Sequence, residues 1–133
     1  MPLPWPAPVW ISTFHRFCAR LLREYAPLVG LSENYTIYDT SDSHGVLKRA
    51  IEQLDFDPTH FTPQSTAASI SSAKNNLFRA QEYQPRPGSP LGAIVAQVYP
   101  RYQALLQKSN AVDFDDLLLH IATLLRESPE VRA

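Results

Sequence analysis

The chain has 133 residues, of which 44% are hydrophobic and 19% charged, and its formal net charge is −1. This length is typical of one compact domain. The balanced charge excludes the strongly basic character of histone-like and basic-arm DNA binders, although not a local basic face. Cys18 is the only cysteine, which excludes an intramolecular disulfide and a thiolate zinc cluster and favours a reducing compartment. No apolar run approaches the roughly 20 residues of a membrane span, and the N-terminus does not resemble a signal peptide, so we expect a soluble cytoplasmic domain.

The chain opens with four prolines that alternate with other residues: Pro2, Pro4, Pro6 and Pro8. Each proline fixes φ and removes an amide donor, so residues 1–8 are expected to form an extended segment outside any helix. Two interpretations stay open here, a frayed terminus and a proline-rich ligand for the groove of a partner protein. The apolar residues 9–11 then predict a short buried strand, for which the sequence offers no obvious partner strand.

From Ser12 the hydrophobic pattern becomes helical. Apolar side chains repeat every three or four positions and predict one buried stripe, made of Phe14, Phe17, Cys18, Leu21, Leu22 and Tyr25. Ser12 or Thr13 can cap the first turn, and Pro27 with Gly30 ends the helix. The other face carries arginines at the same spacing, namely Arg16, Arg20 and Arg23.

A linker over residues 31–38 separates this helix from a second one, which begins at the cap residues Asp39–Asp42 and ends before Pro58. A third helix opens at Thr62, with Pro63 in its first turn. This third helix is rich in Ser and Thr, so its intrinsic propensity is weak and packing must hold it.

The fourth predicted helix has the strongest apolar pattern and runs from Leu91 to Leu106. Pro100 inside it removes a backbone hydrogen bond, so a kink is expected there. Asp113 caps a last helix rich in buried leucine. The sum is an all-α fold, a compact bundle of about five or six helices over residues 9–133.

The chain lacks the motifs of a stand-alone catalyst. A phosphate-binding loop needs closely spaced glycines followed by lysine, and none of the glycines precedes lysine: Gly30, Gly45, Gly88 and Gly92. The histidines lie on different segments, which argues against zinc: His15, His44, His60 and His120. His15 and Cys18 could form a nucleophilic pair, but a buried cysteine beside a hydrogen-bonded histidine is the favoured interpretation. Three carboxylates, Asp113, Asp115 and Asp116, could suggest a metal site, but a helix cap and the helix dipole explain them better.

Two short strings carry a resemblance to a known family. Residues 11–18, Ile-Ser-Thr-Phe-His-Arg-Phe-Cys, resemble the Thr-Phe-His-Ser-x-Cys motif of superfamily 1 DNA helicases of the UvrD/Rep/PcrA type. Residues 112–118, Val-Asp-Phe-Asp-Asp-Leu-Leu, resemble the Leu-Asp-Phe-Asp-Asp-Leu motif of the same enzymes. Between them, three further stretches resemble the family in order and spacing: residues 35–42, 70–75 and 98–103. The resemblance covers Val9 to Arg132, nearly the whole chain.

The resemblance implies that residues 9–133 correspond to the helical insertion of the first motor domain, subdomain 1B, with short flanks of the RecA-like core. In that family the nucleotide-binding lysine loop precedes this region and the magnesium-binding Asp-Glu strand follows it. ATP and magnesium are therefore implied for the parent helicase, which moves along single-stranded DNA, with 3′ to 5′ polarity expected. No ATPase activity is expected of this chain alone. Its implied partners are the rest of the helicase motor and single-stranded DNA or a single/double-strand junction, bound weakly.

By the same resemblance, the residues implied to contact DNA are Thr13, Phe14, His15, Arg16, Lys74 and Asn75. A hydroxyl, an imidazole or a cation can bind phosphate or sugar, and an aromatic ring can support a base. From the residues alone, Thr13 could equally be a cap, Phe14 a core residue and Lys74 an ordinary solvated lysine. Arg16 stands where the family has serine, so it could add a phosphate contact or obstruct the strand.

Two other functions remain open. A helical protein-interaction module would fit the near-neutral charge and the proline-rich terminus around Trp5. A non-functional helicase remnant would fit the missing ATPase motifs and the departures from the family at Arg16 and Pro100.

Overall fold

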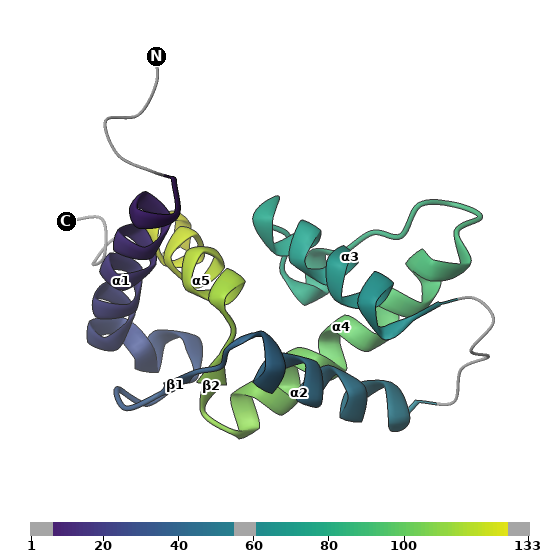
Figure 1. The fold of residues 1–133 in the computed structure, drawn as a ribbon, viewed down its shortest axis with the longest axis horizontal. Helices are drawn as coiled ribbons and strands as arrows, with labels where there is room; N and C mark the ends of the chain where they lie inside the picture. Colours follow the sequence, from purple (N-terminus) through teal and green to yellow (C-terminus); the bar gives the residue numbers. More distant parts are fainter. Residues whose placement is uncertain (1–6, 55–60, 128–133) are drawn as a thin grey trace, which may run out of the picture.

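The computed structural model describes residues 7–54 and 61–127, apart from the side chains of residues 7–12, and these ranges are mostly helical. The α-helices are α1 (Ala7–Tyr25), α2 (Thr40–Glu52), α3 (Pro63–Asn75), α4 (Pro90–Lys108) and α5 (Phe114–Glu127). Two short 3-10 helices, η1 (Ala26–Val29) and η3 (Ala80–Glu82), and two strands, β1 (Thr36–Ile37) and β2 (Ala111–Val112), complete the described elements. The predicted all-α class is confirmed (Figure 1). In the part of the chain so described, no helix has the length and hydropathy to cross a membrane.

The start of α1 corrects the prediction for residues 9–11. The expected strand is wrong, because α1 begins at Ala7 and continues through these residues to Tyr25. Pro8 is compatible with a helix here, since the first-turn amides have no intrahelical acceptor. The expected extended segment therefore loses Ala7 and Pro8 to the helix, and its remainder, with Trp5, lies outside the described residues.

Three of the predicted helix caps are confirmed. The Asp39 carboxylate accepts the amide of Asp42 at 2.8 Å at the start of α2. Thr62 and Ser65 form a capping box at the start of α3, with the Ser65 amide 3.0 Å from the Thr62 hydroxyl. Asp113 caps α5, since its carboxylate accepts the amide of Asp116 at 2.9 Å. The fourth helix stays helical through Pro100.

A two-residue parallel strand pair joins segments that are far apart in the sequence. Strand β1 lies in the stretch expected to be a linker, and Thr36 and Ile37 pair with Ala111 and Val112 of β2. The amide of Thr36 donates to the carbonyl of Asn110 at 3.0 Å. This pair fixes where α5 begins, because β2 precedes α5 directly.

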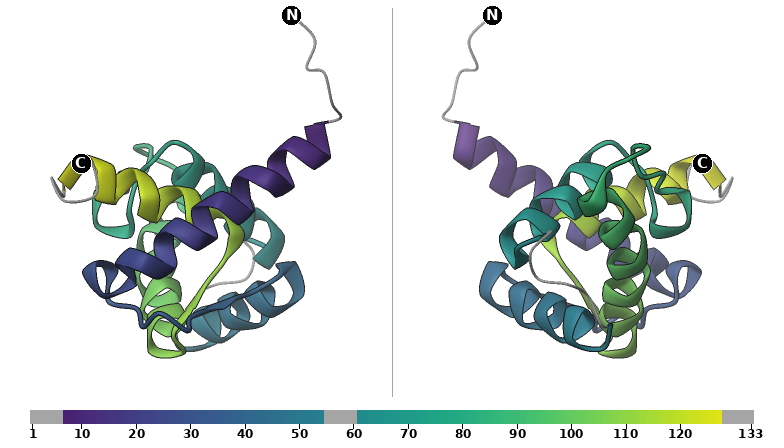
Figure 2. Two further views of the ribbon diagram at one scale, coloured as in Figure 1. Left: turned by 90° about the vertical axis from the view of Figure 1, so that its left-hand side faces the viewer. Right: turned by 90° about the vertical axis from the view of Figure 1, so that its right-hand side faces the viewer.

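The buried residues form two apolar clusters on either side of this strand pair (Figure 1). The first cluster packs α1 against α5 and includes Cys18, Leu22, Tyr35, Val112, Leu117, Ile121 and Leu124. The second packs α2, α3 and α4 together and includes Val46, Leu47, Ala50, Ile70, Val95, Val98, Tyr99, Tyr102 and Ala111. We call these regions the α1/α5 half and the α2–α4 half. Figure 2 (left) shows α1 and α5 together on one face of the molecule.

Candidate nucleic-acid interface

The four expected DNA-contacting residues of the first motif occupy one turn of α1. Thr13, Phe14 and Arg16 are exposed, whereas His15 is half-buried. Consecutive helix positions point in different directions, so these four side chains cannot all meet one strand from the same side. Thr13 and Arg16, three positions apart, share a helix face, while His15 faces α5.

His15 contacts the aromatic ring of Phe114, the first residue of α5. The two ring centroids lie 5.7 Å apart with their planes at 46°. Phe114 remains 45% exposed, so this aromatic pair joins α1 and α5 at the molecular surface. Both residues belong to the family motifs, but only His15 was expected to contact DNA. The hydrophobic pattern hides the exposure of Phe114, because its spacing from Leu117 is that of a buried helix position.

The predicted buried stripe of α1 is only partly correct. Cys18 and Leu22 are buried, but Phe14 is 41% exposed and Phe17 is 60% exposed. Phe17 is next to the buried Cys18 in the sequence but lies on a side of α1 that does not face the core, and the N-terminal end of α1 extends past the rest of the molecule in Figure 2. We use the name aromatic edge for three residues: His15 and Phe114, whose rings are in contact, and the exposed Phe14, which precedes His15 in the sequence.

The three arginines of α1 differ in their contacts. The Arg23 guanidinium binds within the protein: it lies 4.7 Å from the centre of the Tyr35 ring and donates to the carbonyl of Glu33 at 3.0 Å. Tyr35 in turn donates its hydroxyl to the carbonyl of Ala19 at 2.6 Å. Arg16 and Arg20 are exposed, so the cationic surface beside the aromatic edge belongs to the N-terminal part of α1.

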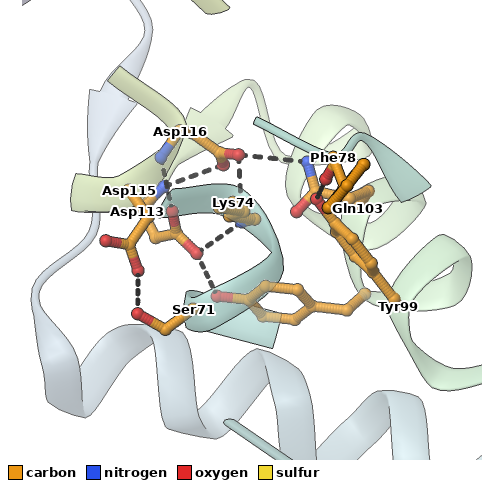
Figure 3. A network of polar contacts seen from close by, with 9 residues as sticks. Ser71, Lys74, Phe78, Tyr99, Gln103, Asp113, Asp115 and Asp116 are labelled. Atoms are coloured by element: carbon orange, nitrogen blue, oxygen red, sulfur yellow. Dashed lines mark hydrogen bonds and ion pairs between the residues drawn. The ribbon is translucent and has the colours of Figure 1, made fainter. Parts of the chain in front are cut away.

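Lys74 lies in neither of the two environments that the sequence suggested. A phosphate contact and a solvated lysine both require an accessible ammonium, but the Lys74 side chain has 0% exposure. Its Nζ lies 2.7 Å from Oδ2 of Asp113 and 2.9 Å from Oδ1 of Asp116 (Figure 3). The expected surface position of Lys74 is therefore wrong: it is the centre of a buried ion-pair network between α3 and α5. Asn75, the next residue, is exposed.

Neighbouring hydroxyl and amide groups complete this network. Tyr102 of α4 donates its hydroxyl to Oδ2 of Asp113 at 2.7 Å, and Gln103 donates to Oδ1 of Asp116 at 3.2 Å. Asp113 and Asp116 also cap each other's amides, at 2.9 and 3.2 Å. The Lys74 ammonium lies 4.9 Å from the centre of the Tyr102 ring. Three helices thus converge on one buried cation, and the carboxylates serve as cap and counterions.

The electrostatics of the network follow from burial and close opposite charges. Burial opposes the charged form of Lys74, but Asp116 and Asp113 outweigh it and hold its pKa above the usual value. Burial also raises the pKa of Asp113, with the charge of Asp116 adding to the shift. For Asp116 burial acts in the same direction, but the Lys74 ammonium prevails and keeps its pKa below the usual value. Burial lowers the pKa of the nearby His120.

Two other interpretations of the sequence can now be compared with the structure. Cys18 is buried in the α1/α5 half, and burial raises the pKa of its thiol, as expected for an inert core cysteine. Within residues 7–54 and 61–127, no group of three or more His, Cys, Asp or Glu side chains could hold a metal ion. None of the four glycines precedes a lysine, and the Lys74 ammonium is paired with two aspartates.

Comparison with known proteins identifies the family. The model of the UvrD/REP helicase N-terminal domain matches residues 6–133, and the chain belongs to this family. It is 38% identical over 125 residues to the ATP-dependent DNA helicase PcrA of Leuconostoc citreum, covering 94% of this chain. It is 39% identical over 123 residues to PcrA of Bacillus subtilis and 36% identical over 123 residues to PcrA of Staphylococcus aureus, each covering 92% of this chain. The chain spans 17% of the length of each of these relatives, so it matches one segment of each of them.

Proposed function

We propose that this chain is an accessory DNA-contacting segment of an ATP-dependent DNA helicase. In this proposal residues 9–133 form the helical insertion of the first motor domain with short flanks of its core. ATP and magnesium are bound elsewhere in the helicase, which translocates in the 3′ to 5′ direction. The rest of the motor is the protein partner of the segment. The family membership supports the parent activity, and the aromatic edge supports the DNA contact.

The observation that carries the proposal is the exposed ring of Phe114 beside the imidazole of His15. Single-stranded nucleic acid is bound without sequence preference by aromatic rings that stack on bases together with cations and hydroxyls that bind the backbone. Phe114 offers such a ring beside His15, and Phe14 offers another. Thr13 and Arg16 offer a hydroxyl and a guanidinium on a different face of the same turn of α1, so they would contact other nucleotides of the strand. We therefore propose that a single strand crosses the α1/α5 half at this edge.

Asn75 is a second proposed contact, on the α2–α4 half. Its exposed amide ends α3, one residue after the buried Lys74. An amide binds phosphate or sugar through hydrogen bonds without a charge. Lys74 has no direct DNA contact in this proposal, because its ammonium is inaccessible and already paired with two carboxylates.

Binding is expected to be weak, sensitive to salt and independent of sequence. The net charge of −1 supplies little long-range attraction to DNA. Each phosphate contact to a single strand contributes about −0.7 to the slope of log affinity against log salt. With one or two exposed arginines near the edge, the slope should be shallow.

Fluorescence anisotropy with a labelled oligothymidine tests the proposal. We expect saturable binding at low salt that weakens as salt is added. Phe114→Ala should weaken binding about tenfold, since base stacking on one ring is worth about 1–3 kcal/mol. The matched control is Phe78→Ala, because Phe78 is similarly exposed, at 51%, but lies outside the aromatic edge, where it lines a cavity between α3 and η3. Absence of binding at low salt, or equal losses in the two variants, would overturn the proposal.

A further inference from the structure

We propose that Lys74 is a positioning residue for nucleic-acid binding. Through Asp113 and Asp116, the buried ammonium on α3 fixes the first turn of α5 and so the orientation of Phe114 at the aromatic edge. This inference rests on the proposed function, because it assigns to a residue remote from DNA the control of a ring proposed to contact DNA.

The neighbours of Phe114 in the sequence are the residues that hold Lys74. Phe114 lies between the two carboxylates that hold Lys74, directly after Asp113 and two residues before Asp116. Those two side chains and their mutual caps immobilise the backbone on both sides of the ring. With both flanks anchored, the backbone of Phe114 is fixed, and only its χ angles and its contact with His15 decide where the ring lies.

A third anchor comes from the same face of α3. Ser71, three residues before Lys74, donates its hydroxyl to Oδ2 of Asp115 at 2.7 Å (Figure 3). Helix α3 therefore holds all three aspartates that surround Phe114 in the sequence. Phe114 is the residue of this group that points its side chain to the surface, beside His15.

The burial of the network makes this placement rigid. Lys74, Asp116 and Tyr102 are all buried, so separating the charges would leave an uncompensated ion in the interior. Replacing a buried ion pair by apolar side chains of similar volume is often neutral for stability, so stability alone does not explain the network. Its directional bonds to three helices specify one geometry for the start of α5.

A double-mutant cycle on the full 133-residue chain tests this inference, with oligothymidine anisotropy as the readout. Lys74→Met is expected to weaken binding by up to the roughly tenfold factor lost in Phe114→Ala. The variant with both changes should bind no more weakly than Phe114→Ala alone, because Lys74 acts through that ring. An unchanged affinity in Lys74→Met, or an additive loss in the double variant, overturns the inference.

A milder variant keeps the test decisive if Lys74→Met does not fold. Tyr102→Phe removes one hydrogen bond to Asp113 and should weaken binding by a smaller factor, again only when Phe114 is present. Tyr83→Phe, which keeps the ring contact with Tyr99, is the matched control and should bind like the wild type. If Tyr102→Phe binds like Tyr83→Phe, or weakens binding equally without Phe114, the inference is wrong.

A spectroscopic readout separates orientation from general loss of structure. An oligonucleotide containing 2-aminopurine changes its fluorescence when the base stacks on an aromatic ring. At saturating DNA, Lys74→Met should lose this change while remaining bound, and a retained change overturns the inference. If the wild type binds no DNA, or if Phe114→Ala binds like the wild type, the proposed function fails as well. If Phe114 matters and Lys74 acts independently of it, the inference alone fails.

Discussion

Both halves of the molecule are built of helices, but they differ in the side chains that they expose and in the charges that they bury. The α1/α5 half has an apolar core, and its exposed rings lie toward the N-terminal end of α1 and at the start of α5. The α2–α4 half is also apolar inside, but it borders a buried cation held by two carboxylates of α5. In our proposal, the main surface offered to DNA lies on the α1/α5 half, while the α2–α4 half sets the orientation of Phe114 on that surface.

The largest expected effect concerns the boundary between the halves. Lys74→Met leaves Asp113 and Asp116 buried without their counterion, so the free energy of unfolding should fall by about 3–5 kcal/mol. Urea unfolding followed by circular dichroism measures this loss. Lys48→Met, at an exposed position of α2, is the control and should change stability by less than about 0.5 kcal/mol. Equal stabilities of the two variants would contradict the claim that the ion-pair network holds the two halves together.

The apolar core of the α1/α5 half should respond nearly as strongly. Leu22 of α1 is fully buried in the apolar core of this half. Leu22→Ala should therefore lower the free energy of unfolding by about 2–5 kcal/mol through lost burial and a residual cavity. Leu28→Ala, at an exposed position of η1, should cost much less. Thermal unfolding of the two variants gives the comparison. A small loss for Leu22→Ala would mean that α1 packs loosely on α5.

A smaller effect is expected from pH at His120 of α5. Burial lowers the pKa of His120 in the folded state, with the nearby Lys74 acting in the same direction and Asp116 and Asp113 opposing. Below pH 6.5, the ordinary imidazole value, the unfolded chain takes up a proton before the folded chain does. Stability should therefore fall as pH falls through this range. His120→Leu should flatten the dependence, whereas His44→Gln, at an exposed site of α2, should retain it. Urea midpoints across the range report the slopes, and equal slopes in all three proteins contradict the assignment.

The smallest effect is expected from a single exposed arginine. Arg16→Ala should reduce the salt slope of DNA affinity by about 0.7, the share of one phosphate contact. Arg101→Ala removes another exposed arginine, from α4 on the other half, and should leave the slope unchanged. Anisotropy titrations at several salt concentrations distinguish the two. If both variants change the salt slope alike, the two halves do not differ in their contacts with phosphate.

Local signals in the sequence were enough to predict the helices and several of their ends. Asp39, Thr62 and Asp113 act as predicted because a cap depends on amides only three residues away. The strand pair escaped prediction because each strand has two residues, too few for an alternating pattern. The strand expected over residues 9–11 failed for a related reason, since a short apolar run does not distinguish helix from strand.

The candidate site was harder to predict because it depends on contacts across the fold. Lys74 and Asp113 are 39 positions apart in the sequence, and the helix of Lys74 gives no sign of this partner. Phe17 and Phe114 both follow core spacing, yet both lie exposed, because burial depends on what the helix packs against. The two family motifs contain His15 and Phe114 separately, and only the structure shows that their rings are in contact.

The most direct test of the account is a map of the surface that single-stranded DNA contacts. Amide chemical shifts of the isotopically labelled chain, recorded while oligothymidine is added at low salt, provide this map. The account predicts that the largest changes cluster at residues 13–16 and at Phe114 and its neighbours, with a smaller change at Asn75. Changes concentrated on the exposed faces of α2 and α4, or no changes at any DNA concentration, would contradict it.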